Sequence, residues 1–491
     1  TFSAQESRTV IGVNDAYELP PIPGVGFLKP DTSNLIRFRA SYVSGPPPRR
    51  KDLSAADIVN ESDEIEIYDF TAAPLRLEEK DIEKAEEAKA QAEEELSEFS
   101  DSGIPGVPNT TFDIAVARME GKGPSAHQVW LPPLDEPATL DSLMPDLRIS
   151  PSLGLHSPRW RGAGAFVVPV GDVDRPLDQR RDTLVLDLDG SGGHLAIVGA
   201  PQSGKSTFAR TVVGALALTH TPQEVQVYVM DFGGGTFAGF AGAPHVAGIA
   251  TRDTEEVRTR MLAEIAAIMD DRERYFRAHG IDSMDTYRRG RLEGTYDDGY
   301  GDVFLVIDGW GALRSEFDSL DRHVTTMMSR GLSLGVHLII AANRWMDIRA
   351  DAQDIFGSRL ELHTANPKES IINRQGAARI PKGRPGRGID MAGHEMMIGL
   401  PRADEEPDPT TVSQGVAYTV NKIREHLVAG EGPKLRLLPE QITLEDILSQ
   451  LPKQHILPRG GGDMILGLEE SRLGPLLFNT RTDSHLYLFG D

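Results

Sequence analysis

Short apolar runs alternate with longer stretches of helical periodicity between residues 126 and 430. The runs are Ala165–Val170, Leu184–Leu188, Leu195–Val198, Val225–Met230, Val303–Ile307 and Val336–Ala341. A short continuous apolar run is typical of a strand buried on both faces, and strands separated by helices pair in parallel. The longest expected helix runs from about Thr254 to His279. The pattern therefore predicts one α/β module in residues 126–430, with a mostly parallel sheet flanked by helices.

The segments before this module have different patterns. Residues 1–50 contain short strand-like pieces such as Leu35–Phe38, separated by Pro- and Gly-rich turns, and are too few to fold alone. Further along, Glu64–Tyr68 alternates like a half-exposed strand, and Leu77–Phe99 favours a helix with almost no apolar stripe. We interpret residues 51–125 as an acidic linker with a solvated helix. Docking of that helix on a basic neighbour is the alternative.

A glycine-rich motif directly follows the run Leu195–Val198 and precedes a helical pattern. Residues 199–206 have the form G-x-x-x-x-G-K-S, in which glycines let backbone N–H groups approach a phosphate and the next helix presents its positive end to the anion. Lys205 is expected to neutralise the β- and γ-phosphates, and Ser206 to bind Mg²⁺. A glycine-rich turn without a ligand is the alternative. The predicted cofactors are ATP and Mg²⁺, and the predicted nucleotide-binding residues are Gly199, Gln202, Ser203, Gly204, Lys205, Ser206 and Thr207.

A second nucleotide-related motif is the apolar run Val303–Ile307 that ends in Asp308. A carboxylate at the carboxyl end of a strand beside the P-loop is where Mg²⁺ would be held, so Asp308 is a predicted metal-binding and catalytic residue. Many motor ATPases carry Glu directly after this Asp to activate the attacking water, whereas this chain has Gly309. Either another carboxylate such as Asp231 takes that role, or hydrolysis is slow. Asp231 is also interpretable as an ordinary strand-end turn residue.

Polar residues further along supply the remaining candidates. Asn343 follows the run Val336–Ala341 closely and is predicted to sense the γ-phosphate as a second catalytic residue, although a turn-forming Asn is the simpler interpretation. Arg359 and Arg374 could complete the site of a neighbouring subunit, or be ordinary surface arginines.

Composition excludes several classes of protein. The 491 residues contain no cysteine, so disulfides and thiolate metal sites are excluded, which fits a chain on the cytosolic side. No apolar run approaches the roughly 20 residues that span a bilayer. The formal net charge of −23 argues against non-specific nucleic-acid binding, which needs a basic face, and leaves open a local basic patch in the fold.

The chain also repeats itself. Residues 485–490, His-Leu-Tyr-Leu-Phe-Gly, restate residues 194–199, His-Leu-Ala-Ile-Val-Gly. In the other direction, residues 1–7 match residues 364–370 in their Thr, Glu and Ser positions. We therefore expect the tail of one module in residues 1–50, a whole module in residues 126–430 and the beginning of a further module in residues 431–491. Both ends of the chain are expected to be cut ends.

These motifs together resemble the FtsK/SpoIIIE branch of the additional-strand P-loop ATPases, which have a RecA-like fold. The resemblance is carried by the P-loop, Asp308–Gly309, the strand before Asn343, Glu369–Ser370 and Pro385–Gly388. Within that branch, Asp231-Phe-Gly-Gly-Gly, Trp130-Leu-Pro-Pro-Leu-Asp and the opening Thr-Phe-Ser-Ala-Gln-Glu-Ser are similar to the EccC ATPases of mycobacterial type VII (ESX) secretion. The match covers essentially the whole chain.

The resemblance implies the end of the first, the whole second and the start of the third of three ATPase modules. It implies an anchor to the cytoplasmic face of the plasma membrane in a region absent from this chain, membrane-embedded secretion components as partners, and a hexameric intact protein. Secreted helical hairpins with a C-terminal export signal are the implied substrates, contacted by modules that bind ATP but serve regulation or docking. A DNA translocase of the FtsK type is the alternative function, and a structural module with a vestigial P-loop is a third.

Overall fold

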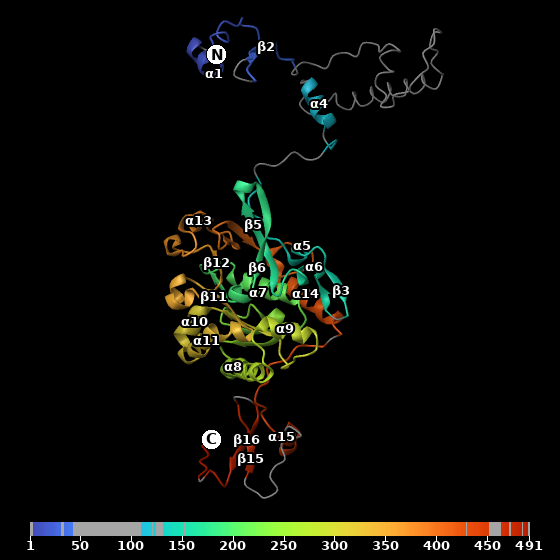
Figure 1. Ribbon diagram of the computed structural model, residues 1–491, viewed down its shortest axis with the longest axis vertical. Helices are drawn as coiled ribbons and strands as arrows, with labels where there is room; N and C mark the ends of the chain where they lie inside the picture. Colours follow the sequence, from blue (N-terminus) through green and yellow to red (C-terminus); the bar gives the residue numbers. More distant parts are fainter. Residues whose placement is uncertain are drawn as a thin grey trace, which may run out of the picture. The chain divides into compact units, whose positions relative to one another are not determined.

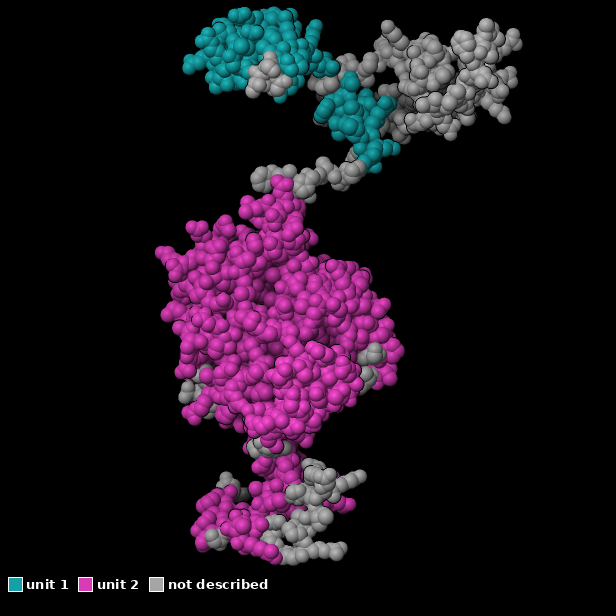
Figure 2. Space-filling view, in the orientation of Figure 1, with its two compact units in different colours: residues 1–127 teal, residues 128–491 magenta. Residues whose placement is uncertain are grey.

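The computed structural model describes residues 3–30, 34–42, 110–119, 121–123, 131–151, 153–428, 430–450, 463–470, 473–483 and 485–489. The chain divides into two compact units, residues 1–127 and 128–491, which are described separately below (Figure 2). The expected strand Glu64–Tyr68 and the expected helix Leu77–Phe99 lie outside the described residues. The division into a module tail, a linker, a whole module and a module start stays a prediction.

The first unit contains helix α1 (Ala4–Ile11), the antiparallel strands β1 (Val25–Leu28) and β2 (Ile36–Arg39), and helix α4 (Thr111–Met119). Helix α1 begins after Ser3, whose hydroxyl accepts a hydrogen bond from the Glu6 amide, and ends at Gly12 in a left-handed conformation. Strand β2 coincides with the expected strand piece Leu35–Phe38 within one residue at each end.

The second unit is built on a ten-stranded sheet in the order β6-β5-β14-β13-β12-β7-β11-β10-β8-β9. Figure 1 labels β5, β6, β11 and β12 of this sheet. The strands are β5 (Val167–Arg175), β6 (Arg180–Asp187), β7 (Leu195–Val198), β8 (Val225–Asp231), β9 (Val246–Thr251), β10 (Asp302–Asp308), β11 (Val336–Ala342), β12 (Ser358–Leu362), β13 (Arg387–Ile389) and β14 (Glu395–Ile398). The six strands from β12 to β9 are parallel to one another.

The remaining four strands differ from the sequence-based prediction, because they do not pair in parallel. Strands β13, β14, β5 and β6 pair antiparallel in succession from the edge of β12. The apolar runs Ala165–Val170 and Leu184–Leu188 therefore belong to an antiparallel hairpin. A short apolar run does not encode the direction of a strand, and β6 is an edge strand in which Val185 is exposed between the buried Leu184 and Leu186. The mostly parallel sheet flanked by helices is confirmed.

Helices cover both faces of this sheet. They are α5 (Leu140–Leu143), α6 (Pro158–Arg161), α7 (Lys205–Ala217), α8 (Glu255–His279), α9 (Met284–Leu292), α10 (Trp310–Glu316), α11 (Asp318–Arg330), α12 (Ala350–Gln353), α13 (Arg374–Arg379) and α14 (Val412–His426). Helix α15 (Leu444–Gln450) instead contacts strand β15 (Asp463–Leu468). Two short hairpins complete the described elements of the unit: β3 (Arg148–Ser150) with β4 (Gly154–His156), and β15 (Asp463–Leu468) with β16 (Pro475–Asn479).

The core has two layers that follow the alternation of side chains along each strand. In β10, Phe304 and Val306 face a cluster that contains side chains of α7 and α14. The alternate residues Val303, Leu305 and Ile307 face a second cluster that contains side chains of α8, α10 and α11. Successive strand residues point to opposite faces, and both faces of β10 are covered by one of these clusters. Every residue of such a strand is therefore buried, which explains the uninterrupted apolar runs in the sequence.

Among the residues that the structure describes, no helix is both long enough and apolar enough to cross a membrane.

Candidate functional site

The P-loop connects β7 to α7 at the carboxyl edge of the parallel strands. The Gly199 amide donates to the carbonyl of Ala342 at 3.1 Å, and the Ala200 amide donates to the carbonyl of His363 at 2.8 Å. The loop is therefore tied to the ends of both neighbouring strands, β11 and β12. This places it where ligands bind in open α/β sheets, outside the carboxyl ends of the strands.

Gly204 precedes the first residue of α7 and adopts a left-handed conformation with φ of 104°. A β-carbon at this position would lie 3.0 Å from the Gly386 amide nitrogen and 3.2 Å from Ile398 Cδ1. Gln202 also has a positive φ, of 62°, which side chains adopt rarely. The loop is thus tightly curved and closely packed from behind, which is the reason for glycine at position 204.

Lys205 is folded back onto this loop. Its Nζ donates to the carbonyl oxygens of Gly199 at 2.7 Å and Ala200 at 2.9 Å. Burial lowers the pKa of Lys205 to about 8, although the carboxylates of Asp308 and Asp347 act in the opposite direction. A partly desolvated ammonium in this position is held beside the loop whose amides would surround a phosphate.

The carboxylates of Asp308 and Asp231 end the adjacent strands β10 and β8 in register with each other. Both are buried, with 3% and 2% exposure. The Thr236 hydroxyl lies between them, 3.3 Å from Asp308 Oδ2 and 3.5 Å from Asp231 Oδ2. Burial raises the pKa of Asp308, and the negative charge of Asp231 acts in the same direction.

Asp231 is bound by the loop that follows it. Its Oδ1 accepts a hydrogen bond from the Gly233 amide and its Oδ2 accepts one from the Phe237 amide, both at 3.0 Å. A β-carbon at Gly233 would lie 2.6 Å from Asp308 Oδ2, so glycine is required for this loop to approach Asp308. The contacts of Asp231 therefore match the turn-residue interpretation more closely than that of a free general base.

The donor set fits a magnesium ion that is bound together with phosphate. The Ser206 hydroxyl lies near enough to the Asp308 carboxylate to lower the pKa of that carboxyl, so the two side chains that the sequence predicts as ligands lie together. In the part of the chain that the structure describes, no group of three or more His, Cys, Asp or Glu residues could hold a metal ion. Magnesium uses few protein ligands and several phosphate or water oxygens, so a Ser–Asp pair is sufficient.

Arg210, which the sequence analysis missed, also belongs to this site. From α7 its guanidinium donates to the carbonyl of Thr236 at 3.4 Å and to the Thr207 hydroxyl at 3.3 Å. Burial lowers its pKa, while Asp308 and Asp231 act in the opposite direction. The sequence could have indicated the contact between Arg210 and Thr207, because these residues are three apart and lie on one face of a helix.

Gly309 lacks a carboxylate and also has a backbone conformation that favours glycine. It has φ of 97°, and a β-carbon there would lie 3.0 Å from Phe232 Cβ. The backbone between β10 and α10 is therefore in a conformation that non-glycine residues rarely adopt.

The other predicted residues are spread more widely. Asn343 follows β11 directly and is exposed, next to the residue whose carbonyl binds the Gly199 amide. Arg359 is half-buried within β12, and Arg374 is exposed at the start of α13. The structure thus brings Asn343 to the same sheet edge as the P-loop, and places neither arginine among the contacts of Lys205 or Asp308 described above.

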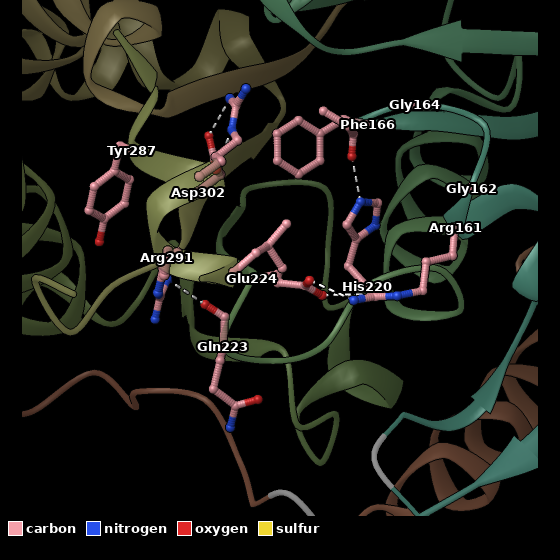
Figure 3. A pocket seen from close by; sticks show the side chains of 14 residues that line it. Arg161, Gly162, Gly164, Phe166, His220, Gln223, Glu224, Tyr287, Arg291 and Asp302 are labelled. Carbon is pink, nitrogen blue, oxygen red and sulfur yellow. Dashed lines mark hydrogen bonds and ion pairs between the residues drawn. The ribbon is translucent and has the colours of Figure 1, made fainter. Parts of the chain in front are cut away.

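A second, apolar pocket lies at the opposite edge of the sheet (Figure 3). Its lining includes Asp302, the first residue of β10, and Glu224, directly before β8. Its volume is about 510 Å³, and its lining includes Phe166, Tyr287 and Leu292. The charged groups around it are already paired, as in the ion pair of Arg161 and Glu224 at 2.7 Å in Figure 3. The pocket is therefore suited to an apolar ligand.

Residues 168–405 match the family model described as FtsK/SpoIIIE family. With a P-loop, a strand-end Asp308 and the mostly parallel sheet, the chain belongs to the P-loop ATPases of this family. Along its whole length it is also homologous to the EccC proteins of ESX secretion systems. It is 42% identical over 497 residues to the ESX secretion system protein EccC of Thermomonospora curvata, and 39% identical over 492 residues to the ESX-4 secretion system protein EccC4 of Mycobacterium tuberculosis.

Solved structures agree with this assignment. The cytoplasmic domain of the Thermomonospora curvata type VII secretion ATPase EccC matches 98% of this chain and 49% of its own, with a TM-score of 0.71 and 41% identity. A structure of ATPases 2 and 3 of the same protein with a signal sequence peptide matches 72% of this chain and 63% of its own, with a TM-score of 0.66 and 43% identity. The chain spans only 36% and 35% of the two curated relatives.

Proposed function

We propose that this chain is part of a type VII secretion motor, and that its module at residues 126–430 binds ATP and Mg²⁺ with little hydrolysis of its own. Membership of the family implies nucleotide binding. The observation that carries the rest is an intact P-loop with Lys205 beside Asp308, combined with Gly309 at the position after Asp308.

Each residue has a role that its position supports. The Gly199 and Ala200 amides hold the loop against β11 and β12, so the amides of Gln202, Gly204 and Lys205 and the Lys205 ammonium would surround the phosphates. Thr207 would extend this cradle along α7. Ser206 and Asp308 would hold Mg²⁺, which supplies charge neutralisation when bound. Asn343 would contact the γ-phosphate from the end of β11. Asp231 would fix the loop that carries Thr236 against Asp308.

The contacts of the carboxylates support the proposal of slow hydrolysis. A general base must be free to accept a proton from water. Both Asp231 oxygens already accept backbone hydrogen bonds, and Gly309 has no side chain. In this proposal the module reports nucleotide state to its neighbours instead of driving movement itself.

The apolar pocket at the opposite edge of the sheet is proposed as the docking site for a peptide. The Thermomonospora curvata relative is described with a signal sequence peptide, and an apolar cavity of about 510 Å³ can take one or two large side chains of such a segment. In the same proposal the whole protein is anchored to the cytoplasmic face of the plasma membrane, works with membrane-embedded secretion components and assembles as a hexamer. Its substrates are secreted helical hairpins with a C-terminal export signal.

Calorimetry on the full chain tests nucleotide binding. Lys205→Ala removes a charged partner of the phosphates, worth about 1.5–3 kcal/mol, and should weaken ATP binding roughly ten- to a hundredfold. Lys422→Ala, at a half-buried position on α14 where the lysine pairs with Glu425, is the matched control and should leave affinity unchanged. Equal affinity in the wild type and Lys205→Ala would overturn the assignment of the P-loop.

Steady-state phosphate release tests the absence of turnover. We expect negligible release with saturating ATP and Mg²⁺. Turnover near the roughly 1–100 s⁻¹ typical of kinases, abolished by Asp231→Asn, would show that Asp231 is a catalytic base and that the regulatory role is wrong.

A further inference from the structure

Arg387 is a buried arginine that joins two parts of the chain far apart in sequence. It begins β13 and is 9% exposed. Its Nη2 donates to Glu395 Oε2 at 2.7 Å, and its Nη1 donates to the carbonyl oxygen of Leu134 at 3.1 Å. Leu134 is itself buried and lies in residues 131–140, which we call the lead-in segment because it enters the module before the first strand of the sheet.

The backbone around Arg387 supports the P-loop from behind. The Gly386 amide donates to the carbonyl of Ser203 at 2.8 Å. The carbonyl of Arg387 accepts from the His363 amide at 3.3 Å, and the carbonyl of His363 accepts from the Ala200 amide at 2.8 Å. Two short hydrogen-bonded connections therefore run from residues 386–387 to Ser203 and Ala200 of the P-loop.

The lead-in segment reaches the nucleotide site by another connection as well. The Leu400 amide donates to the carbonyl of Ala138 at 2.7 Å, and Thr139 forms a bridge with Leu400. The neighbouring carbonyl of Gly399 accepts a hydrogen bond from the Thr211 hydroxyl on α7 at 2.7 Å. The segment thus contacts the same antiparallel strands that hold both the P-loop and the helix after it.

We propose that Arg387 is a positioning residue for nucleotide binding, which couples the seating of the lead-in segment to the shape of the P-loop. This inference rests on the proposed ATP binding and adds how that binding is regulated. A guanidinium can bond a carboxylate and a carbonyl at once in fixed geometry, whereas a lysine ammonium is a single point charge. A force or binding event that withdraws Leu134 would remove one of the contacts of Arg387 and loosen the support of Gly204.

The first test measures ATP affinity with a fluorescent ATP analogue on the full chain. Arg387→Lys keeps the charge and should weaken binding on the order of tenfold, within the usual range of coupling between sites. Glu395→Gln removes the negative charge that the other side of the guanidinium contacts, and should also weaken ATP binding. Arg379→Ala is the matched control, because this exposed arginine lies 3.8 Å from the same Glu395 carboxylate and does not reach the lead-in segment through any contact given above.

A second readout separates positioning from general loss of stability. Coupling is reciprocal, so ATP should slow hydrogen exchange of the amides in residues 131–140 of the wild type. Arg387→Lys should lose this protection while it keeps a cooperative melting transition. Ile268→Ala, a buried truncation in the cluster on the other face of the sheet, should lower the melting temperature without changing ATP affinity.

The outcomes are distinguishable. If the wild type does not bind ATP, the proposed function fails and this inference fails with it. If the wild type binds ATP and Arg387→Lys and Glu395→Gln both bind it as Arg379→Ala does, nucleotide binding stands and the role of Arg387 is overturned. Loss of affinity in Ile268→Ala equal to that in Arg387→Lys would likewise overturn it.

Discussion

The affinity for ATP should fall as pH rises from 7 to 9, because Lys205 loses its proton in this interval. Burial lowers the pKa of Lys205 to about 8, from an ordinary value of 10.5. At pH 7 about 90% of the free protein carries the charged lysine, and at pH 9 about 10% does. Bound phosphate favours the charged form, so binding at pH 9 must include uptake of a proton. The apparent dissociation constant should therefore rise roughly tenfold between these two values.

The folding stability of the nucleotide-free protein should rise as pH rises, whereas the affinity for ATP falls. Between pH 8 and about 10.5 the unfolded chain keeps the Lys205 proton and the folded chain does not. Folding stability rises with pH wherever the unfolded state binds more protons, so this group contributes increasing stability through that window. The same lysine thus makes ATP binding weaker and the free fold more stable as the solution becomes more alkaline.

Titration with a fluorescent ATP analogue at pH 7, 8 and 9 measures the effect on affinity. Lys205→Arg is the control, because a guanidinium stays charged over the whole range and its profile should be flat even if its affinity is lower. A flat profile in the wild type would refute the reasoning, and so would an equal slope in the wild type and Lys205→Arg.

Further predictions concern backbone, linker and partner. Gly309→Ala should destabilise the chain by about 1–2 kcal/mol in thermal melts, because Gly309 has a φ of 97° that alanine rarely adopts. Gly311→Ala, in α10 with open space around it, is the control and should stabilise the chain by about 0.5–1 kcal/mol. A similar effect of both substitutions would contradict backbone strain at position 309. Changing Glu93, Glu94 and Glu95 to Gln should leave the melting temperature nearly unchanged, and a large shift would mean that the linker helix docks. The acidic chain should not be retained on DNA at low salt; retention that is lost steeply as salt rises would favour a translocase.

The sequence could predict that the residues of the nucleotide site lie close together, because the carboxyl ends of parallel strands lie at one edge of the sheet. Val303–Ile307 and Val225–Met230 were recognisable as buried strands, so Asp308 and Asp231 were expected near the P-loop, and the structure places them in register. The roles of these residues stay predictions.

The contacts of the site were not predictable to the same extent. Thr236 reaches Asp308 only because Gly233 lets the loop turn back, and a sequence pattern does not give the path of a loop. The four antiparallel strands of the sheet were missed because β13 and β14 are short and the apolar runs of β5 and β6 do not encode direction. Gly309 was interpreted only as the absence of a carboxylate, whereas its left-handed backbone is a separate constraint.

The position of the four antiparallel strands in the chain has a consequence for synthesis. Strand β5 precedes the P-loop in the chain, but its partner β14 comes after all six parallel strands, so that Val173 pairs with Met396. A growing chain on the ribosome has therefore made the P-loop long before it has made the strands that support it. Contacts between distant residues form slowly, because the entropy of closing the loop must be overcome first. The nascent module would stay open along the edge of β12 until residue 398 has emerged, and this interval is when it most needs protection from aggregation.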